Sequence, residues 1–138
     1  MQSGETMIAI DTNIIVRFLT RDDEQQYQKA YQIFALSEHI FISTTVILET
    51  EWVLRFSYHF SVERIIFALS NLLALDNVSI ENKTAIISAL QWHQQGMDFA
   101  DALHLAGCFN KAETFATFDR GIYNKANLIN LKYPITLL

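Results

Sequence analysis

Short apolar runs alternate along the chain with longer segments in which apolar residues recur at helical spacing. The runs predict strands at residues 7–10, 39–42, 78–80 and 114–118, with an edge strand at 135–138. The other segments predict helices after Asp11 and over about 23–36, 46–56, 61–75, 82–95 and 98–110. Strands that alternate with helices are typical of right-handed crossovers and a parallel sheet. We therefore expect an α/β fold: a three-layer α/β/α domain with a central parallel sheet.

Acidic residues follow two of the predicted strands. The run at 7–10 is apolar throughout, as in a buried parallel strand, and it stops on Asp11. Asp119 follows the run at 114–118, and Thr117 projects to the same side of that strand as Asp119. In open α/β sheets, function gathers at the carboxyl ends of the strands. Both aspartates are therefore candidate site residues.

Each of these two aspartates also has a structural interpretation. Asp11 is a favoured residue type for capping the helix that follows it. Arg120 and Lys125 either neutralise Asp119 in a surface ion pair or contact phosphate at the rim of a site. Sequence alone leaves these alternatives open.

Glu49 lies in a predicted helix with two apolar stripes. At about 100° per residue, Glu49 shares one face with Thr45, Val46, Trp52, Val53 and Phe56, and Glu51 lies about 200° away. This geometry predicts that Glu49 is the inward acid, against the alternative of a solvated glutamate. The opposite stripe consists of Ile47, Leu54 and Tyr58. We expect it to be covered by another helix or by a partner chain.

Asp98 and Asp101 are three residues apart and point the same way from the first turn of a predicted helix. Asp98 as a cap and Asp101 in the first turn would both interact favourably with the helix dipole. That structural role is compatible with a place in a site at the carboxyl edge of the sheet. His104 lies on the flank of the same helix, where a packing or surface role is the usual one.

Composition limits the classes of protein that the chain can represent. Its 138 residues suit one domain, which we expect over 7–138 after a disordered extension at 1–6. Because no apolar run reaches about 18 residues and the start lacks signal-peptide features, we expect a cytoplasmic protein without a membrane span. Cys108 is the only cysteine, which excludes an internal disulfide. A net charge of −5 without a basic stripe argues against nucleic-acid binding driven by counterion release alone.

Clustered carboxylates predict a site for a hard divalent cation. Mg²⁺ and Mn²⁺ prefer oxygen ligands, and such ions promote hydrolysis of phosphate esters by activating water. Competing chemistries lack their motifs, because the chain has no Gly-x-Gly-x-x-Gly, no P-loop and no Gly-x-Ser-x-Gly. An aspartyl-phosphate hydrolase would want Asp-x-Asp after its first strand, where this chain has Asn13.

Four motifs together resemble the PIN-domain family, and more narrowly its VapC-like toxins. They are Asp11-Thr12-Asn13, the segment 47–54 around Glu49, the segment 98–103 and the segment 115–119. The resemblance implies a Mg²⁺- or Mn²⁺-dependent endoribonuclease that cuts RNA by metal-activated water. The implied catalytic and metal-binding residues are Asp11, Glu49, Asp101 and Asp119, with Asp98, Asn13 and Thr117 as auxiliary residues. It also implies a homodimer and inhibition by a cognate antitoxin.

Two further hypotheses remain open. The chain could be a catalytically silent PIN-like module whose acids bind a basic peptide of a partner. Alternatively, its substrate could be structured DNA, although the short chain lacks insertions suited to grip a duplex. Saturable Mn²⁺ binding and EDTA-sensitive RNA cleavage would distinguish the nuclease from the silent module.

Overall fold

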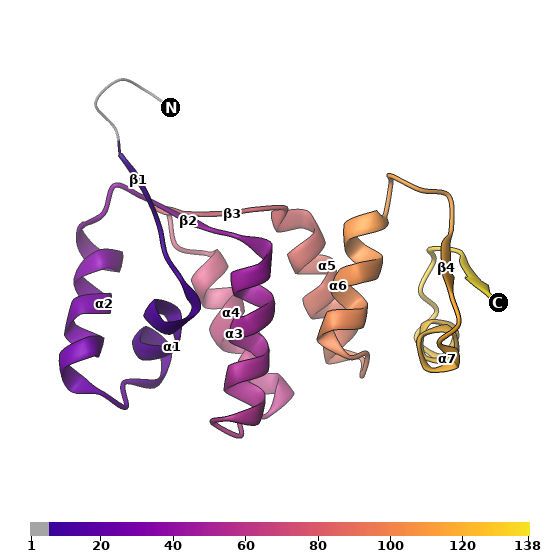
Figure 1. Ribbon diagram of the computed structural model, residues 1–138, viewed down its shortest axis with the longest axis horizontal. Coiled ribbons are helices and arrows are strands. Elements are labelled where there is room, and N and C mark those ends of the chain that lie inside the picture. The colour runs from indigo at the N-terminus through magenta and orange to yellow at the C-terminus, as the bar shows by residue number, and fades with distance from the viewer. Residues whose placement is uncertain (1–5) are drawn as a thin grey trace. The chain divides into compact units, whose positions relative to one another are not determined.

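The computed structural model describes residues 6–138, so the predicted disordered extension at 1–6 lies, except for Thr6, outside the described residues. Contacts within the chain divide it into two compact units, the first ending at Lys83 and the second spanning Thr84–Leu138 (Figure 1). A single domain over 7–138 stays a prediction.

The first unit contains a three-stranded parallel sheet of order β1-β2-β3. Its elements are β1 (Met7–Ala9), α1 (Thr12–Thr20), α2 (Glu24–Leu36), β2 (His39–Ile42), α3 (Thr44–Phe56), α4 (Val62–Leu73) and β3 (Val78–Ile80). Ala9 is in register with Phe41, and Ile42 with Ile80, so the three strands end at the same edge. Helix α1 packs against α2 and α3, and α3 packs against α4.

Local capping explains where several helices begin. Asp23 accepts a hydrogen bond from the Gln26 backbone N–H (3.0 Å) and starts α2, and Ser61 accepts one from Arg64 N–H (3.2 Å) and starts α4. Such side chains satisfy N–H groups that have no partner within the helix. Both starts were predicted from the sequence and are confirmed.

Helix α3 begins without a side-chain cap from its own N-cap residue. Ser43 is the N-cap residue, yet its side chain makes no capping bond. Glu81, which follows β3, accepts a hydrogen bond from Thr44 N–H (2.9 Å), and the Thr44 hydroxyl donates to the Glu81 carbonyl (3.1 Å). The carboxylate therefore supplies the cap from 37 residues away and ties α3 to β3.

Strand β1 is exposed, which corrects the prediction that this apolar run is buried. Met7 is 46% exposed and Ile8 40% exposed, and only the following residue, Ile10, is buried. Within the first unit the physical reason is the strand order, because β1 lies beside β2 at the end of the β1-β2-β3 sheet.

The inward face of α3 is also the opposite of the predicted one. Glu51, Ile47 and Leu54 are buried, whereas Trp52 and Phe56 are about half exposed. Glu49 is exposed, so its assignment as the inward acid is wrong. Ile47 and Leu54 belong to the core of the chain itself and need no partner chain to cover them.

This reversal predicts unequal costs for two truncations on α3. Leu54→Ala should lower the free energy of unfolding by roughly 2–5 kcal/mol, because it leaves a cavity at a side chain with no exposed surface. Trp52→Ala should cost at most about 1.5 kcal/mol, since Trp52 is 51% exposed. Urea unfolding of the two variants measures the difference, and a larger loss for Trp52→Ala would contradict the assignment of the core face.

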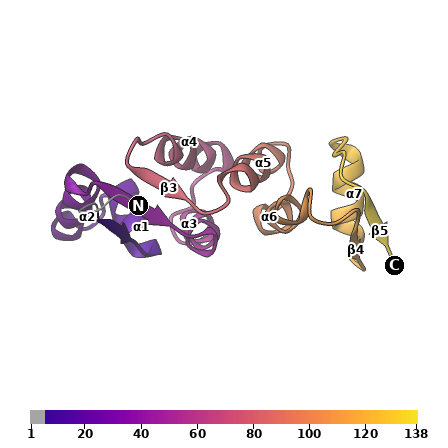
Figure 2. The same cartoon turned by 90° about the horizontal axis from the view of Figure 1, so that it is seen from above.

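The second unit contains a two-stranded parallel sheet. The unit begins at the second residue of α5 (Lys83–Gln94). Its other elements are α6 (Phe99–Cys108), β4 (Phe115–Thr117), α7 (Arg120–Leu128) and β5 (Ile135–Leu137). Phe115 is in register with Ile135, and Thr117 with Leu137. His93 of α5 lies against Phe99 of α6 with ring centroids 5.5 Å apart, and Phe109 meets Tyr133 edge-on at 5.4 Å. Figure 2 shows the same elements from above.

The prediction of an α/β fold is confirmed, because helices alternate with strands and every strand pair among residues 6–138 is parallel. The sequence did not predict α7, whose first turn contains Gly121. Among residues 6–138, no helix combines the length and the apolar character needed to cross a membrane.

Candidate functional site

Asp11 lies at the carboxyl edge of the first sheet, directly before α1. Its Oδ1 accepts a hydrogen bond from the Ile14 backbone N–H (3.2 Å), and its side chain is exposed. The capping role considered from the sequence is therefore present. That role uses Oδ1, so the second carboxylate oxygen, Oδ2, is left for another ligand.

Glu49 is held beside the segment that carries Asp11. The hydroxyl of Thr12, a buried residue, donates a hydrogen bond to Glu49 Oε1. Thr12 and Glu49 are 37 positions apart, and the contact between α1 and α3 brings them together. The first unit therefore fixes one carboxylate of α3 next to the residue that follows Asp11.

Asp98 and Asp101 form the acidic first turn of α6. Asp98 Oδ2 accepts a hydrogen bond from Asp101 N–H (3.2 Å), which makes Asp98 the N-cap. Partial burial raises the pKa of the Asp101 carboxyl, and the negative charges of Asp98 and Asp119 raise that pKa further. His104 has a smaller, opposite effect on the Asp101 pKa. A nearby cation would therefore favour the ionised form of the Asp101 carboxyl.

Asp119 follows β4 and caps α7. Its Oδ1 accepts hydrogen bonds from Gly121 N–H (2.7 Å) and Ile122 N–H (3.2 Å), and its own N–H donates to the Thr117 hydroxyl (3.0 Å). A Cβ on Gly121 would lie 3.0 Å from that carboxylate oxygen, so the close approach suits glycine. The cap also explains why a helix starts here.

Two cations near Asp119 in sequence do not pair with it. The sequence left open a surface ion pair of Asp119 with Arg120 or Lys125, and neither pair is present among residues 6–138. Lys125 Nζ instead lies against Gly96, 3.3 Å from where a Cβ would stand. Gly96 has φ +107°, in the region that favours glycine past a helix end.

The donor set fits a hard divalent cation in its chemistry. The side chains concerned are carboxylates, and Mg²⁺ prefers oxygen ligands of this kind. Within neither unit, over residues 6–138, do three His, Cys, Asp or Glu side chains gather as a metal site requires. The first unit brings Glu49 to Thr12, and the second brings Asp119 within electrostatic range of Asp101. The full set of site residues stays a prediction.

Thr12 lies inside the motif Asp11-Thr12-Asn13, but its role was not predicted from the sequence. The signal was a hydroxyl residue at the first position of a helix, which is seldom buried without a partner. Arg17 was also missed. It lies four residues after Asn13 on the same face of α1, so helical spacing alone could have indicated it.

The raised pKa of Asp101 predicts a dependence of stability on pH. A carboxyl whose pKa is raised by folding stabilises the fold below its ordinary pKa, and this contribution is lost as the pH rises through the raised value. Asp101→Asn should therefore raise the Tm at pH 7, and the gain should shrink as the pH falls through the raised pKa toward the ordinary range. Thermal unfolding at several pH values measures this effect. The exposed Asp76→Asn is the control, and an equal gain there would contradict the prediction.

Comparison with known proteins defines the class of this chain. The model of the PIN domain family matches residues 8–128, a range that includes all the acidic site candidates. The chain belongs to the PIN-domain family, as its motifs indicated. PIN domains are typically nucleases. No curated protein matched the chain.

Two solved structures are similar to the chain. One is the toxin VapC20 of Mycobacterium tuberculosis, described as cleaving the sarcin–ricin loop, with 18% identity and a TM-score of 0.44; the match covers 86% of this chain and 94% of that one. The other is VapBC2 of Rickettsia felis bound to a DNA fragment from its promoter. It shares 16% identity with a TM-score of 0.39 over 95% of this chain and 97% of that one.

Proposed function

We propose that this PIN-domain protein is a Mg²⁺- or Mn²⁺-dependent endoribonuclease that hydrolyses RNA phosphodiester bonds as the toxin of a toxin–antitoxin pair. The carboxylates that bind the ion in this proposal are those of Asp11, Glu49, Asp101 and Asp119. Asp98, Asn13 and Thr117 are auxiliary. Membership of a family whose members are typically nucleases supports this class of activity.

One observation carries the proposal. In the first unit, Thr12, the residue after Asp11, holds Glu49 of α3 by a hydrogen bond, and in the second unit the negative charges of Asp98 and Asp119 act on Asp101. Bringing like charges together is unfavourable unless a cation offsets them. Partial burial is the largest cause of the raised pKa of Asp101, and the charges of Asp98 and Asp119 add to it, so a cation beside these acids would be favourable.

The chain's own residues have separate roles in this proposal. The helix caps at Asp11 and Asp119 hold each carboxylate by one oxygen, which limits its motion and leaves the other oxygen for a ligand. Thr12 orients Glu49, and Thr117 orients the backbone of Asp119. The ion, when bound, would acidify the attacking water and stabilise negative charge on the phosphate.

The proposed partners are an antitoxin protein and a second copy of the chain. Of the apolar stripe that was expected to be covered by another helix or by a partner chain, Ile47 and Leu54 are core residues of the chain itself. The exposed apolar surface of α3 is instead the ring pair of Trp52 and Phe56, with centroids 4.9 Å apart. Coexpression with the product of the neighbouring gene tests for the antitoxin.

The proposal is tested with the purified full chain on tRNA and mRNA. We expect cleavage with Mn²⁺ or Mg²⁺ that EDTA abolishes and that the copurified antitoxin inhibits. Absence of both cleavage and saturable Mn²⁺ binding, with retained binding of a protein partner, would replace the nuclease by the silent interaction module. Cleavage of structured DNA in place of RNA would overturn the substrate assignment.

A further inference from the structure

A hollow of about 240 Å³ lies between α1 and α2 in the first unit. Asp11 and Asn13 line it together with two basic residues, Arg17 of α1 and Lys29 of α2. Its volume is slightly below that of pockets that enclose whole small molecules, so it suits a fragment such as a phosphate and its sugar. The hollow is therefore a basic pocket that also contains one of the proposed ligand carboxylates.

Arg17 is held in a fixed orientation in this hollow. Its Nε–H donates to Gln26 Oε1 (2.6 Å), and its Nη1 donates to the Tyr58 hydroxyl (2.9 Å) and to Asp22 Oδ1 (3.3 Å). These bonds leave the N–H groups of Nη2 without a hydrogen-bond partner among residues 6–138. A guanidinium fixed on one side with free donors on the other loses little entropy when it binds an anion.

Lys29 is exposed and makes no hydrogen bond or ion pair with any of residues 6–138. The carboxylate that shares its hollow, Asp11, instead accepts the capping bond at the start of α1. The positive charge of Lys29 is therefore not used to stabilise the fold. Ammonium and guanidinium groups are the usual side-chain partners of phosphate.

From this juxtaposition we infer that Arg17 and Lys29 bind a phosphate of the RNA strand next to the bond that is cut. The inference rests on the proposed function for the place of Asp11. It also resolves how an acidic chain without a basic stripe holds RNA, because a local pair of cations contacts the backbone beside the acids. Since the phosphate group is the same at every nucleotide, the contact should be independent of RNA sequence.

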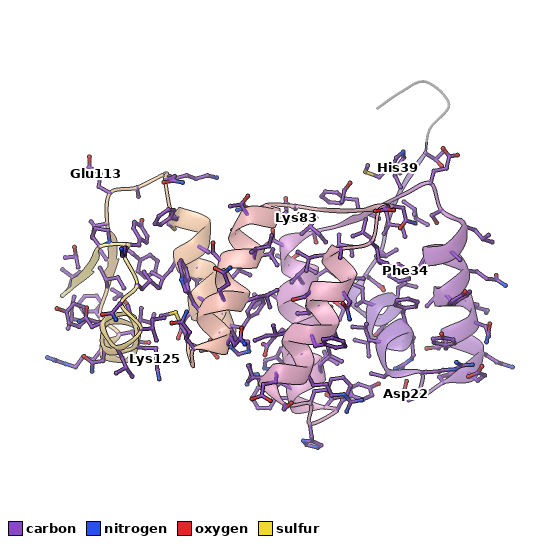
Figure 3. All side chains as sticks on the ribbon, turned by 180° about the vertical axis from the view of Figure 1, so that it is seen from behind. Asp22, Phe34, His39, Lys83, Glu113 and Lys125 are labelled. Atoms are coloured by element: carbon purple, nitrogen blue, oxygen red, sulfur yellow. The ribbon has the colours of Figure 1, made fainter. Side chains whose placement is uncertain are left out.

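Lys29→Gln is the test variant. Arg17 is less suitable, because its bonds to Asp22 and Tyr58 also hold the turn between α1 and α2. Lys83→Gln is the matched control: it removes the same charge from another exposed lysine, well away from Asp22 at that turn (Figure 3). Circular dichroism of both variants checks that the fold is retained.

Binding is measured by fluorescence anisotropy with labelled oligouridine and oligoadenosine in EDTA, so that no cleavage occurs. We expect Lys29→Gln to weaken both affinities by roughly three- to tenfold, and to lower the slope of log K against log salt by about 0.7. Lys83→Gln should change neither. A merely structural role of Lys29 would not move the salt slope.

Three outcomes would overturn the inference: equal binding by both variants and the original chain, no RNA binding by the original chain, or loss of polyglutamate binding with RNA binding unchanged. The last would make the hollow a site for an acidic peptide. Cleavage is assayed separately with Mg²⁺. RNA binding that depends on Lys29, without any cleavage, would support this inference and refute the nuclease. Cleavage by the original chain, with RNA binding unchanged in Lys29→Gln, would support the nuclease and refute this inference.

Discussion

Asp11→Asn is expected to abolish metal-dependent RNA cleavage, with a loss of roughly 100-fold or more, while the fold survives. Asparagine caps helices about as well as aspartate, so the bond from Ile14 N–H to the side chain can persist. The variant lacks the negative charge that a divalent cation requires. Cleavage with Mn²⁺ and Mn²⁺ titration by calorimetry measure the two consequences together.

Asp23→Asn provides a matched control for this prediction. Asp23 caps α2 as Asp11 caps α1, through a bond from Gln26 N–H (3.0 Å), but it has no proposed place in the site. We expect its cleavage rate and Tm to match those of the original chain. Undiminished cleavage by Asp11→Asn, or an equal loss in Asp23→Asn, would refute the assigned role.

Arg55→Met is expected to lower the free energy of unfolding by roughly 3–5 kcal/mol. Arg55 Nε donates to Glu51 Oε2 (2.8 Å) and Nη2 donates to Oε1 (3.2 Å), and the Glu51 side chain is only 1% exposed. Removing the guanidinium takes two hydrogen bonds and a positive charge away from a buried carboxylate. Urea unfolding measures the loss.

The control for Arg55 separates the ion pair from contact with an aromatic ring. Arg55 lies 4.7 Å from the centroid of Phe56, and the exposed Arg64 lies 3.7 Å from that of Phe60 without an ion pair among residues 6–138. Arg64→Met should therefore cost no more than about 1 kcal/mol. The double variant Glu51→Gln, Arg55→Met should be more stable than Arg55→Met alone. Similar losses for Arg55→Met and Arg64→Met would contradict the role assigned to the buried pair.

The elements of this fold could be predicted from sequence because their signals are local. The caps at Asp23 and Ser61 each act on an N–H three residues away, and apolar spacing marks β2 and β3 with their observed bounds. Helix α7 was not predicted because its residues are polar on average and because its start depends on the Asp119 cap. The PIN family was also predictable, since its motifs are short stretches in a fixed order.

The orientation of α3 could not be predicted in the same way. Its sequence presents apolar residues on two opposite faces, so periodicity alone cannot select which one is inward. Packing against α1 and α4 selects the face with Ile47 and Leu54 and buries Glu51, whose partner Arg55 follows four residues later. Glu49, on the other face, becomes available for the contact with Thr12.

By itself, the sequence determined the kinds of element, their order, the family and the acids on which a nuclease would depend, because these follow from residue type and spacing. Only the tertiary structure decided that β1 is an edge strand, that Glu81 caps α3 and that Thr12 holds Glu49. These features join residues up to 37 positions apart. Nothing in local propensity encodes which distant side chains meet, since that depends on how the helices pack around the sheet.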